Sequence, residues 1–281
     1  MWQPTTTVRA TVWRRQGASD GQRTIPEETA VALSYDGGTY AVMMATPQDL
    51  EDFALGFSLS EGIIAAPADI RQLEVVEHAA GVELRMWLAG PRAAALGDRR
   101  RHLAGPTGCG LCGIDSLDEA VRPAPRVTAD ASYTPAEIMQ ALEALPPRQE
   151  LNRQTRAVHA AAFWRRGNGL TAVREDVGRH NALDKLAGAL AREGVAGESG
   201  VVLLTSRVSV EMVQKTAVIG APLLVAVSAP TALALRTAEA AGITLIGVAR
   251  SDGFEIFTHA RRIANEPAAA TVATATVAHV A

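Results

Sequence analysis

The chain has 281 residues, which is enough for one large domain or two smaller domains with a buried core, and we expect two. Its formal net charge of -3 and its aromatic content of 4% provide neither the basic field nor the stacking side chains of a nucleic-acid-binding protein. It has no apolar run long enough to span a bilayer, and two cysteines spaced CxxC do not make the disulfide framework of a secreted protein. We therefore expect a soluble cytoplasmic protein with no nucleic-acid or membrane partner.

The N-terminal third predicts a small α+β domain. Residues 1–24 read as a flexible N-terminus, and residues 29–44 as a β-hairpin that turns at Asp36-Gly37-Gly38. Thr46 and Pro47 supply a helix cap and a first helical residue, and apolar spacing carries that helix to residue 59. Two further strands are expected at 73–76 and 82–88. The predicted small domain covers residues 25–121 and leads into a loop that carries both cysteines.

Cys109 and Cys112 are the only cysteines, and they lie in the glycine-rich segment Thr107 to Gly113. The glycines favour an exposed loop whose backbone does not block access to sulfur. A CxxC pair of this kind serves as a redox dithiol, as a carrier of a transferred sulfur atom, or as half of a zinc site. Zinc is the weakest reading because the chain has no second CxxC, and burial as small apolar residues is the alternative to all three. The upstream run Arg99 to His102 is either solvated charge or an aid to thiolate formation.

A second body is expected after a connector at residues 122–132, which are rich in proline, alanine and aspartate. A helix runs from residue 134 to 144 and ends before Pro146-Pro147, and residues 157–164 form a buried strand or helix in which His159 reads as a core histidine. The run from Arg174 to Lys185 packs seven ionisable side chains and an amide into twelve residues. If a helix begins near residue 178, Asn181 and Lys185 share one face, and so do His180 and Asp184. A hydrated helix entrance with local ion pairs is the alternative to a functional site here.

The last third predicts three parallel strands at residues 201–204, 223–227 and 243–248, with helices at 209–218 and 230–240 between them. Ligands of such α/β sheets bind beyond the carboxyl ends of the strands. Those ends carry Ser206 and Arg207, Ser228, and the segment Ala249 to Gly253. Helix N-termini and arginine side chains bind phosphate, so a nucleotide or pyrophosphate is the expected ligand, with ordinary helix capping as the alternative for Ser228. The domain covers residues 133–266, and residues 267–281 read as a disordered tail.

Several of these segments resemble the FdhD family of formate dehydrogenase accessory sulfurtransferases. The resemblance lies in GCGLCG at 108–113, REDVGRHNALDK at 174–185, SRVSVEMVQK at 206–215, VSAPT at 227–231 and FTH at 257–259, and it covers roughly residues 25–265. The sequence departs from the family pattern at Thr205, where glycine is usual, and at Val210, where an aromatic residue is usual. These departures affect the expected shape of the pocket more than its chemistry.

The resemblance implies a sulfur carrier that works with a cysteine desulfurase and with formate dehydrogenase. Cys109 would carry the sulfur as a persulfide, and Cys112 would be an auxiliary thiol. The cargo site would receive the bis(molybdopterin guanine dinucleotide) form of the molybdenum cofactor, whose nucleotide end GDP or GMP mimics. Its residues would be those of the strand ends, with the family motif at Val248, Ala249, Arg250, Ser251, Asp252 and Gly253 joined by Ser206, Arg207 and Ser228. The resemblance also implies a cytidine deaminase-like main domain and a homodimer.

Two other functions remain open, and mutation of the cysteines separates them. A thiol-disulfide oxidoreductase needs both Cys109 and Cys112, whereas a carrier tolerates loss of Cys112 better than loss of Cys109. A non-catalytic chaperone that only holds the cofactor keeps its function without Cys109. A zinc deaminase is excluded, because His159 is followed by two alanines where the acid-base glutamate is required.

Overall fold

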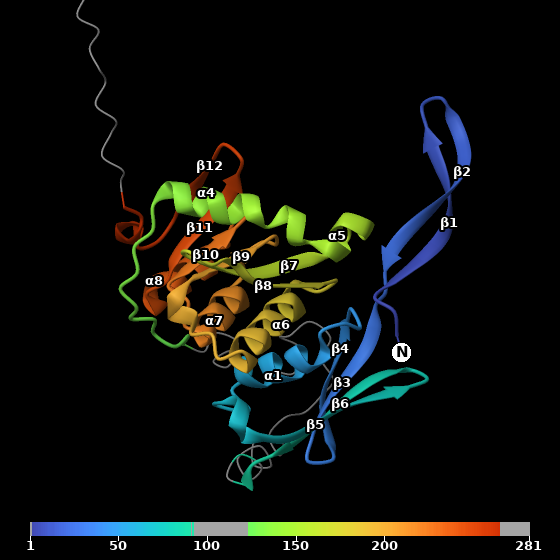
Figure 1. The fold of residues 1–281 in the computed structure, drawn as a ribbon, viewed down its shortest axis with the longest axis horizontal. Coiled ribbons are helices and arrows are strands. Elements are labelled where there is room, and N and C mark those ends of the chain that lie inside the picture. The colour runs from blue at the N-terminus through green and yellow to red at the C-terminus, as the bar shows by residue number, and fades with distance from the viewer. Residues whose placement is uncertain (1, 91, 93–122, 265–281) are drawn as a thin grey trace, which may run out of the picture.

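A computed structural model describes residues 2–90, 92 and 123–264, and Figure 1 shows a mixed α/β fold with three sheets. The predicted cysteine loop with Cys109 and Cys112, and the tail predicted at 267–281, lie outside the described residues. Within the described part, no helix combines the length and the apolar character that crossing a membrane requires. The three sheets correspond to a hairpin, a small α+β unit and a larger α/β domain.

The N-terminus begins with a long β-hairpin, so the prediction of a flexible segment over residues 1–24 is wrong. Strands β1 (Thr5–Arg14) and β2 (Gly17–Pro26) pair antiparallel with no other strand beside them. In β1, Val8, Ala10 and Val12 alternate with Arg9 and Thr11, which is the period-2 pattern of a strand, whereas β2 has few apolar residues and no such alternation. Threonine and valine also favour extended backbone, and contacts between side chains on the two strands stabilise the hairpin further.

The small unit is a four-stranded sheet covered by one helix, as predicted. Its strands are β3 (Thr29–Tyr35), β4 (Gly38–Ala45), β5 (Ile70–His78) and β6 (Gly81–Leu88), in the order β4-β3-β6-β5. β3 and β6 run parallel, and both hairpins are antiparallel. Helix α1 (Leu50–Ser60) packs on the sheet, with Phe53 and Phe57 against Leu33 and Leu84 in one apolar core. A short turn of 3-10 helix (Pro67–Asp69) precedes β5.

The larger domain is a six-stranded sheet with helices on both faces. The sheet order is β12-β11-β10-β9-β7-β8. Its strands are β7 (His159–Arg165), β8 (Gly169–Asp176), β9 (Val201–Leu204), β10 (Leu223–Ala226), β11 (Thr244–Arg250) and β12 (Gly253–Ile256). β9, β10 and β11 are parallel, as the strand and helix alternation predicts, whereas β7, β8 and β12 add antiparallel edges.

Successive side chains of a strand point to opposite faces of the sheet, so the sheet has an apolar core with helices on each face. Val202 and Leu204 of β9 face one core together with Leu183 and Val213, whereas Val201 and Leu203 face a second core with Ile138 and Trp164. The first core belongs to α6 (Arg179–Arg192), α7 (Val210–Ile219) and α8 (Ala232–Ala241), and the second to α4 (Pro135–Ala144). Shorter turns are α5 (Glu150–Thr155) and 3-10 helices at Pro146–Arg148, Gly197–Ser199 and Ala260–Arg262.

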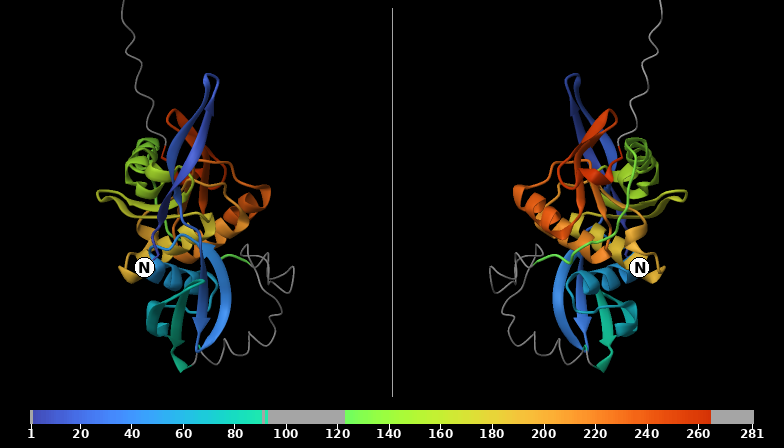
Figure 2. Two further views of the ribbon diagram at one scale, coloured as in Figure 1. Left: turned by 90° about the vertical axis from the view of Figure 1, so that its right-hand side faces the viewer. Right: turned by 90° about the vertical axis from the view of Figure 1, so that its left-hand side faces the viewer.

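The small unit docks on the main domain through α1 and α6 (Figures 1 and 2). The contact depends on two glycines: a Cβ added at Gly56 would lie 1.7 Å from the carbonyl oxygen of Asp184, and one at Gly188 would lie 1.9 Å from that of Asp52. The helix backbones therefore touch. α1 begins at Leu50 after a left-handed Asp49, and not at Thr46 and Pro47 as predicted. The hydroxyl of Thr46 does not cap the helix, because it accepts from the amide of Val177 at 3.1 Å in this junction.

Candidate functional site

The carboxyl ends of β9, β10 and β11 meet at one edge of the main sheet, as predicted. Backbone hydrogen bonds tie the segments that follow the strands: the amide of Val227 donates to the carbonyl of Leu204 at 3.0 Å, and that of Val248 to the carbonyl of Ser228 at 3.2 Å. The predicted positions at Ser206, Ser228 and Val248 therefore lie in neighbouring segments. We call this set of segments, 205–209, 227–231 and 248–253, the strand-end edge.

Arginine side chains line the strand-end edge. Arg250 bridges the ends of β10 and β11, because its Nη1 donates to the carbonyl oxygens of Ala249, at 3.0 Å, and of Val227. Arg250 and Arg207 are both exposed, while Ser206 is buried and donates its hydroxyl to the carbonyl of Arg207 at 3.1 Å. The edge therefore presents two cations to solvent on a hydrogen-bonded frame.

The end of β11 is strained at the predicted cofactor segment. Val248 has a φ of 51°, in the left-handed region that β-branched residues avoid. Such a conformation costs about 1–3 kcal/mol and persists where the surrounding structure holds it. Beyond it, Ser251 and Asp252 form the exposed turn that leads through Gly253 into β12. Of the predicted segment, Val248 to Arg250 thus lie at the strand end itself, and the other three lie in the adjoining turn.

Ser228 is not a helix cap. The cap of α8 is Thr231, whose hydroxyl accepts from the amide of Ala234 at 3.2 Å. Ser228 instead lies three residues upstream and receives the Val248 amide on its carbonyl. Ordinary capping, the alternative considered for Ser228, therefore does not explain that residue.

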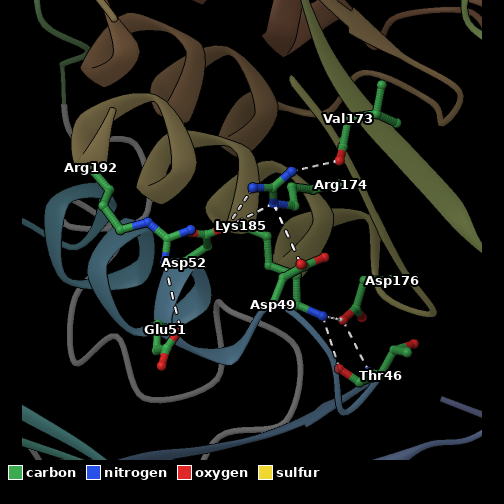
Figure 3. A network of polar contacts seen from close by, with 9 residues as sticks. All are labelled: Thr46, Asp49, Glu51, Asp52, Val173, Arg174, Asp176, Lys185 and Arg192. Atoms are coloured by element: carbon green, nitrogen blue, oxygen red, sulfur yellow. Dashed lines mark hydrogen bonds and ion pairs between the residues drawn. The ribbon is translucent and has the colours of Figure 1, made fainter. Parts of the chain in front are cut away.

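The REDVGRHNALDK run forms a buried polar network between the two units, which we call the junction network (Figure 3). Asp176 is its centre: one carboxylate oxygen accepts from Lys185 Nζ at 2.6 Å and from the Thr46 amide at 3.0 Å, and the other accepts from Asn181 Nδ2 at 3.0 Å. Lys185 also donates to the Thr46 carbonyl at 2.9 Å. The side chains of Asp176 and Lys185 are fully buried. Asn181 and Lys185 share a helix face, as predicted, because both turn toward Asp176.

A second set of ion pairs extends the junction network along the helices. Arg174 and Arg192 both pair with Asp52 of α1, at 2.7 Å and 3.0 Å, and Asp52 is 3% exposed (Figure 3). Asp184 pairs with Lys215 of α7 at 2.8 Å, and burial raises the pKa of Asp184 despite this cation. The carboxylates of these ion pairs are buried, and most of the pairs join residues far apart in the sequence, so the alternative of a hydrated helix entrance with local pairs is wrong.

Two members of this architecture escape prediction from the sequence. The available signal for Asp52 was its position in an otherwise apolar helix. A carboxylate that is buried there requires a cationic partner. Glu175 receives the amides of Leu151 and Asn152 at 2.7 Å and 2.8 Å, so it caps the start of α5. Its partners lie more than twenty residues away, and nothing in the local pattern identifies them.

A polar cluster lies where α6 and α7 begin, next to the strand-end edge. His180 Nε2 is 3.9 Å from Glu211 Oε2, and the interaction with His180 lowers the pKa of Glu211 to about 2. His159 stands opposite Asp176 in the sheet register, and burial together with Arg179 lowers its pKa. Within the described part of the chain, no group of three or more His, Cys, Asp or Glu side chains is placed to hold a metal ion.

Comparison with known proteins identifies the chain's relatives. The model of the FdhD/NarQ family matches residues 26–264. The chain belongs to the FdhD/NarQ family. It is 54% identical to the sulfur carrier protein FdhD of Agrobacterium fabrum over 91% of this chain and 95% of that one. The corresponding protein of Cupriavidus necator is 52% identical over 90% of this chain and 88% of that one.

A solved structure agrees with the fold described above. The crystal structure of a candidate formate dehydrogenase accessory protein from Desulfotalea psychrophila has a TM-score of 0.74 and 27% identity, and covers 93% of this chain and 100% of that chain. Because the match covers 93% of this chain, it extends over both units. Membership of the FdhD/NarQ family confirms the resemblance found in the sequence, while Cys109 and Cys112 stay outside the described residues.

Proposed function

We propose that this chain is a sulfur carrier that serves formate dehydrogenase. It accepts a sulfur atom from a cysteine desulfurase as a persulfide on Cys109 and delivers it to the molybdenum of bis(molybdopterin guanine dinucleotide). One observation carries the proposal: a chain of the FdhD/NarQ family, about half identical to proteins named sulfur carriers, has its only two cysteines together in GCGLCG. The pair offers one sulfur nucleophile and one neighbouring thiol.

Loading follows from thiolate chemistry. The Cys109 thiolate attacks the outer sulfur of the desulfurase persulfide, a new S–S bond forms on Cys109, and the donor cysteine leaves as a thiolate. No net oxidant is needed, because the sulfur atom only changes its partner. Cys112 is an auxiliary thiol in this scheme. The transfer belongs in the cytoplasm, where thiols stay reduced.

The strand-end edge is the proposed docking site for the nucleotide end of the cofactor, which is cargo. Arg207 and Arg250 supply exposed cations for its phosphates. Ser206, Ser228 and the segment Val248 to Gly253 supply hydroxyl and backbone groups on a frame fixed by hydrogen bonds between neighbouring segments. Pre-organised groups bind with a smaller loss of conformational entropy than mobile ones. The edge therefore suits an anionic dinucleotide better than an apolar ligand.

Two further features complete the proposal. We propose that the main domain is cytidine deaminase-like in fold, supported by its sheet with helices on both faces, but not in chemistry, because Ala160 and Ala161 follow His159. We also propose that two copies of the chain assemble into a homodimer.

Intact-protein mass spectrometry after incubation with a cysteine desulfurase and cysteine tests the function. The protein should gain the mass of one sulfur atom, and a reductant should remove it. Cys109→Ala should lose this gain, and Cys112→Ala, its matched control, should keep it.

The alternatives give different outcomes when the same variants are also assayed for maturation of formate dehydrogenase. Retention of the added sulfur by Cys109→Ala would contradict the assignment of the carrier thiol. Equal loss of formate dehydrogenase maturation in Cys109→Ala and Cys112→Ala, without any added sulfur in the wild type, would favour a thiol-disulfide oxidoreductase. Full maturation with Cys109→Ala would favour a chaperone that only holds the cofactor.

A further inference from the structure

Phe257 is a large apolar side chain that stays exposed next to the strand-end edge. β12 pairs with β11 in the main sheet, and the segment Phe257 to His259 follows β12 directly (Figure 1). The side chain of Phe257 is 37% exposed. Single exposed apolar side chains are common on protein surfaces, so exposure alone gives this one no function. Its function follows from what surrounds the ring and what holds it in place.

Gly247 makes room for the phenyl ring near the end of β11. A Cβ added at Gly247 would lie 3.0 Å from Pro230 Cδ and 3.1 Å from Phe257 Cε2. The carbonyl oxygen of Ser228 lies 3.2 Å from the same position. Gly247 does not have the left-handed backbone that favours glycine, so its missing side chain serves the packing of the ring. The ring therefore reaches the segment 227–231 of the strand-end edge.

Hydrogen bonds to β11 and to the residue before it fix the backbone that carries the ring. The amide of Phe257 donates to the carbonyl of Leu245 at 2.9 Å. The next residue, Thr258, is buried, and its hydroxyl accepts from the Leu245 amide at 2.8 Å. The same hydroxyl donates to the carbonyl of Ile243 at 2.7 Å. The ring thus projects from a fixed point of the sheet, and a ligand that binds it orders little further backbone.

The phenyl ring and Arg250 approach the same short turn after β10. Arg250 donates to the carbonyl of Val227 at the start of this turn, and the ring approaches Ser228 and Pro230. Consecutive Cα atoms are about 3.8 Å apart, so those of Val227 and Pro230 are at most about 11 Å apart. A cation that suits phosphate and an aromatic face that suits a base therefore lie within the span of one nucleoside diphosphate.

We propose that Phe257 is the stacking platform for the guanine base of the cargo, while the arginines of the strand-end edge hold its phosphates. Every base has a π face, and stacking on an aromatic side chain contributes to binding without reading the base by hydrogen bonds. Phe257 therefore adds affinity for a base and leaves the choice between bases to other groups. The inference rests on the proposed cargo site and names the residue that holds its base, and it is independent of sulfur loading at Cys109.

Calorimetric titration of the full-length protein with GDP tests the platform. Phe257→Ala should lower the affinity about tenfold, which is within the range for loss of one stacked base. Phe257→Leu keeps an apolar side chain without an aromatic face and should lose almost as much, whereas Phe257→Trp should restore the affinity. Ile256→Ala is the matched control, because Ile256 is also 37% exposed and points to the opposite face of the sheet. It should bind GDP as the wild type does.

A second readout is the fluorescence of Phe257→Trp. GDP should quench the added tryptophan relative to the wild type, because stacking brings the base against the indole ring. Wild-type affinity in Phe257→Ala or in Phe257→Leu would overturn the platform alone. So would a Phe257→Trp protein that binds as weakly as Phe257→Ala and shows no quenching.

The wild-type protein separates this inference from the proposed function. Absence of GDP binding by the wild type would overturn the strand-end edge as the cargo site together with the platform. The gain of one sulfur atom at Cys109 is measured without GDP, so it still reports whether the chain is a sulfur carrier.

Discussion

The junction network and the strand-end edge are both rich in charged side chains, but these are buried and paired in the first and exposed to solvent in the second. At the junction, Asp176 and Lys185 are fully buried and each finds several partners. At the edge, Arg207 and Arg250 are exposed on a frame of backbone hydrogen bonds. Buried and fully paired charge specifies how two units dock, whereas exposed charge at strand ends is available to a ligand. The longest recognisable motif of this sequence therefore contributes to the docking of the two units, and the proposed cargo site lies beside it.

The largest effect should come from breaking the helix contact that underlies the junction. Gly56→Val places side-chain atoms where the carbonyl of Asp184 lies, 1.7 Å from the first added carbon. Because this clash is with backbone, we expect a loss of stability on the order of 4 kcal/mol or more, measured by urea unfolding. Gly90→Val is the matched control, since no atom of the described residues lies within 4 Å of a Cβ built at this position. A Gly56→Val protein as stable as this control would contradict the close packing of α1 on α6.

Removing one charge from the centre of the junction network should have the next largest effect. Lys185→Met leaves the carboxylate of Asp176 buried without its cation, which costs about 3–5 kcal/mol in the free energy of unfolding. Arg153→Met removes one partner of an exposed pair with Glu150 and should change stability by less than about 0.5 kcal/mol. Equal effects of the two changes in denaturant titrations would mean that burial does not determine how much these ion pairs contribute to the free energy of unfolding.

Substitutions at the strand-end edge should change the affinity for a ligand and leave the stability of the fold unchanged. Arg250→Ala removes an exposed cation next to the predicted phosphate position, so the affinity for GDP should fall about tenfold, or ~1.4 kcal/mol. Calorimetric titration with GDP measures this, with Arg236→Ala, an exposed arginine of α8, as control. Unchanged GDP affinity in Arg250→Ala would remove this arginine from the proposed cargo site.

The smallest effect concerns the polar cluster between the two regions. The pKa of Glu211 is about 2 in the folded protein against 4.5 as its ordinary value, so its stabilising contribution is present above pH 4.5 and is lost as the pH falls toward 2. Glu211→Gln should lower stability at neutral pH by about 1 kcal/mol and flatten its decline below pH 4.5. Thermal unfolding between pH 6 and about pH 3 measures the difference, and Glu193→Gln, at an exposed position, is the control. An unchanged pH profile in Glu211→Gln would contradict the pairing with His180.

The sequence predicts those parts of the fold that depend on local pattern. These parts are the parallel strands β9, β10 and β11, their helices and the edge where the strands end. They follow from buried apolar runs, helix caps and the alternation of strands with helices. The same reasoning misses the hairpin of β1 and β2, since the short alternation at Val8, Ala10 and Val12 is followed by a second strand with few apolar residues. Strand pairing there depends on the partner strand, which a local window does not contain.

Side-chain partners are harder to predict than elements. The helix face shared by Asn181 and Lys185 follows from a four-residue spacing, but their common partner Asp176 and the contact with Thr46 depend on how the small unit docks. Asp52 meets Arg174 across more than a hundred residues. For Ser228, sequence spacing suggests a cap, and only the observed start of α8 assigns that role to Thr231.

The most direct test of the central claim follows the sulfur atom out of the protein. Protein loaded by a desulfurase is mixed with the molybdenum cofactor, and the sulfur remaining on Cys109 is measured by mass spectrometry. The wild type should lose its added sulfur to the cofactor, while Arg250→Ala, loaded to the same extent, should retain most of it. Retention of the sulfur by the wild-type protein in the presence of the cofactor would contradict the account.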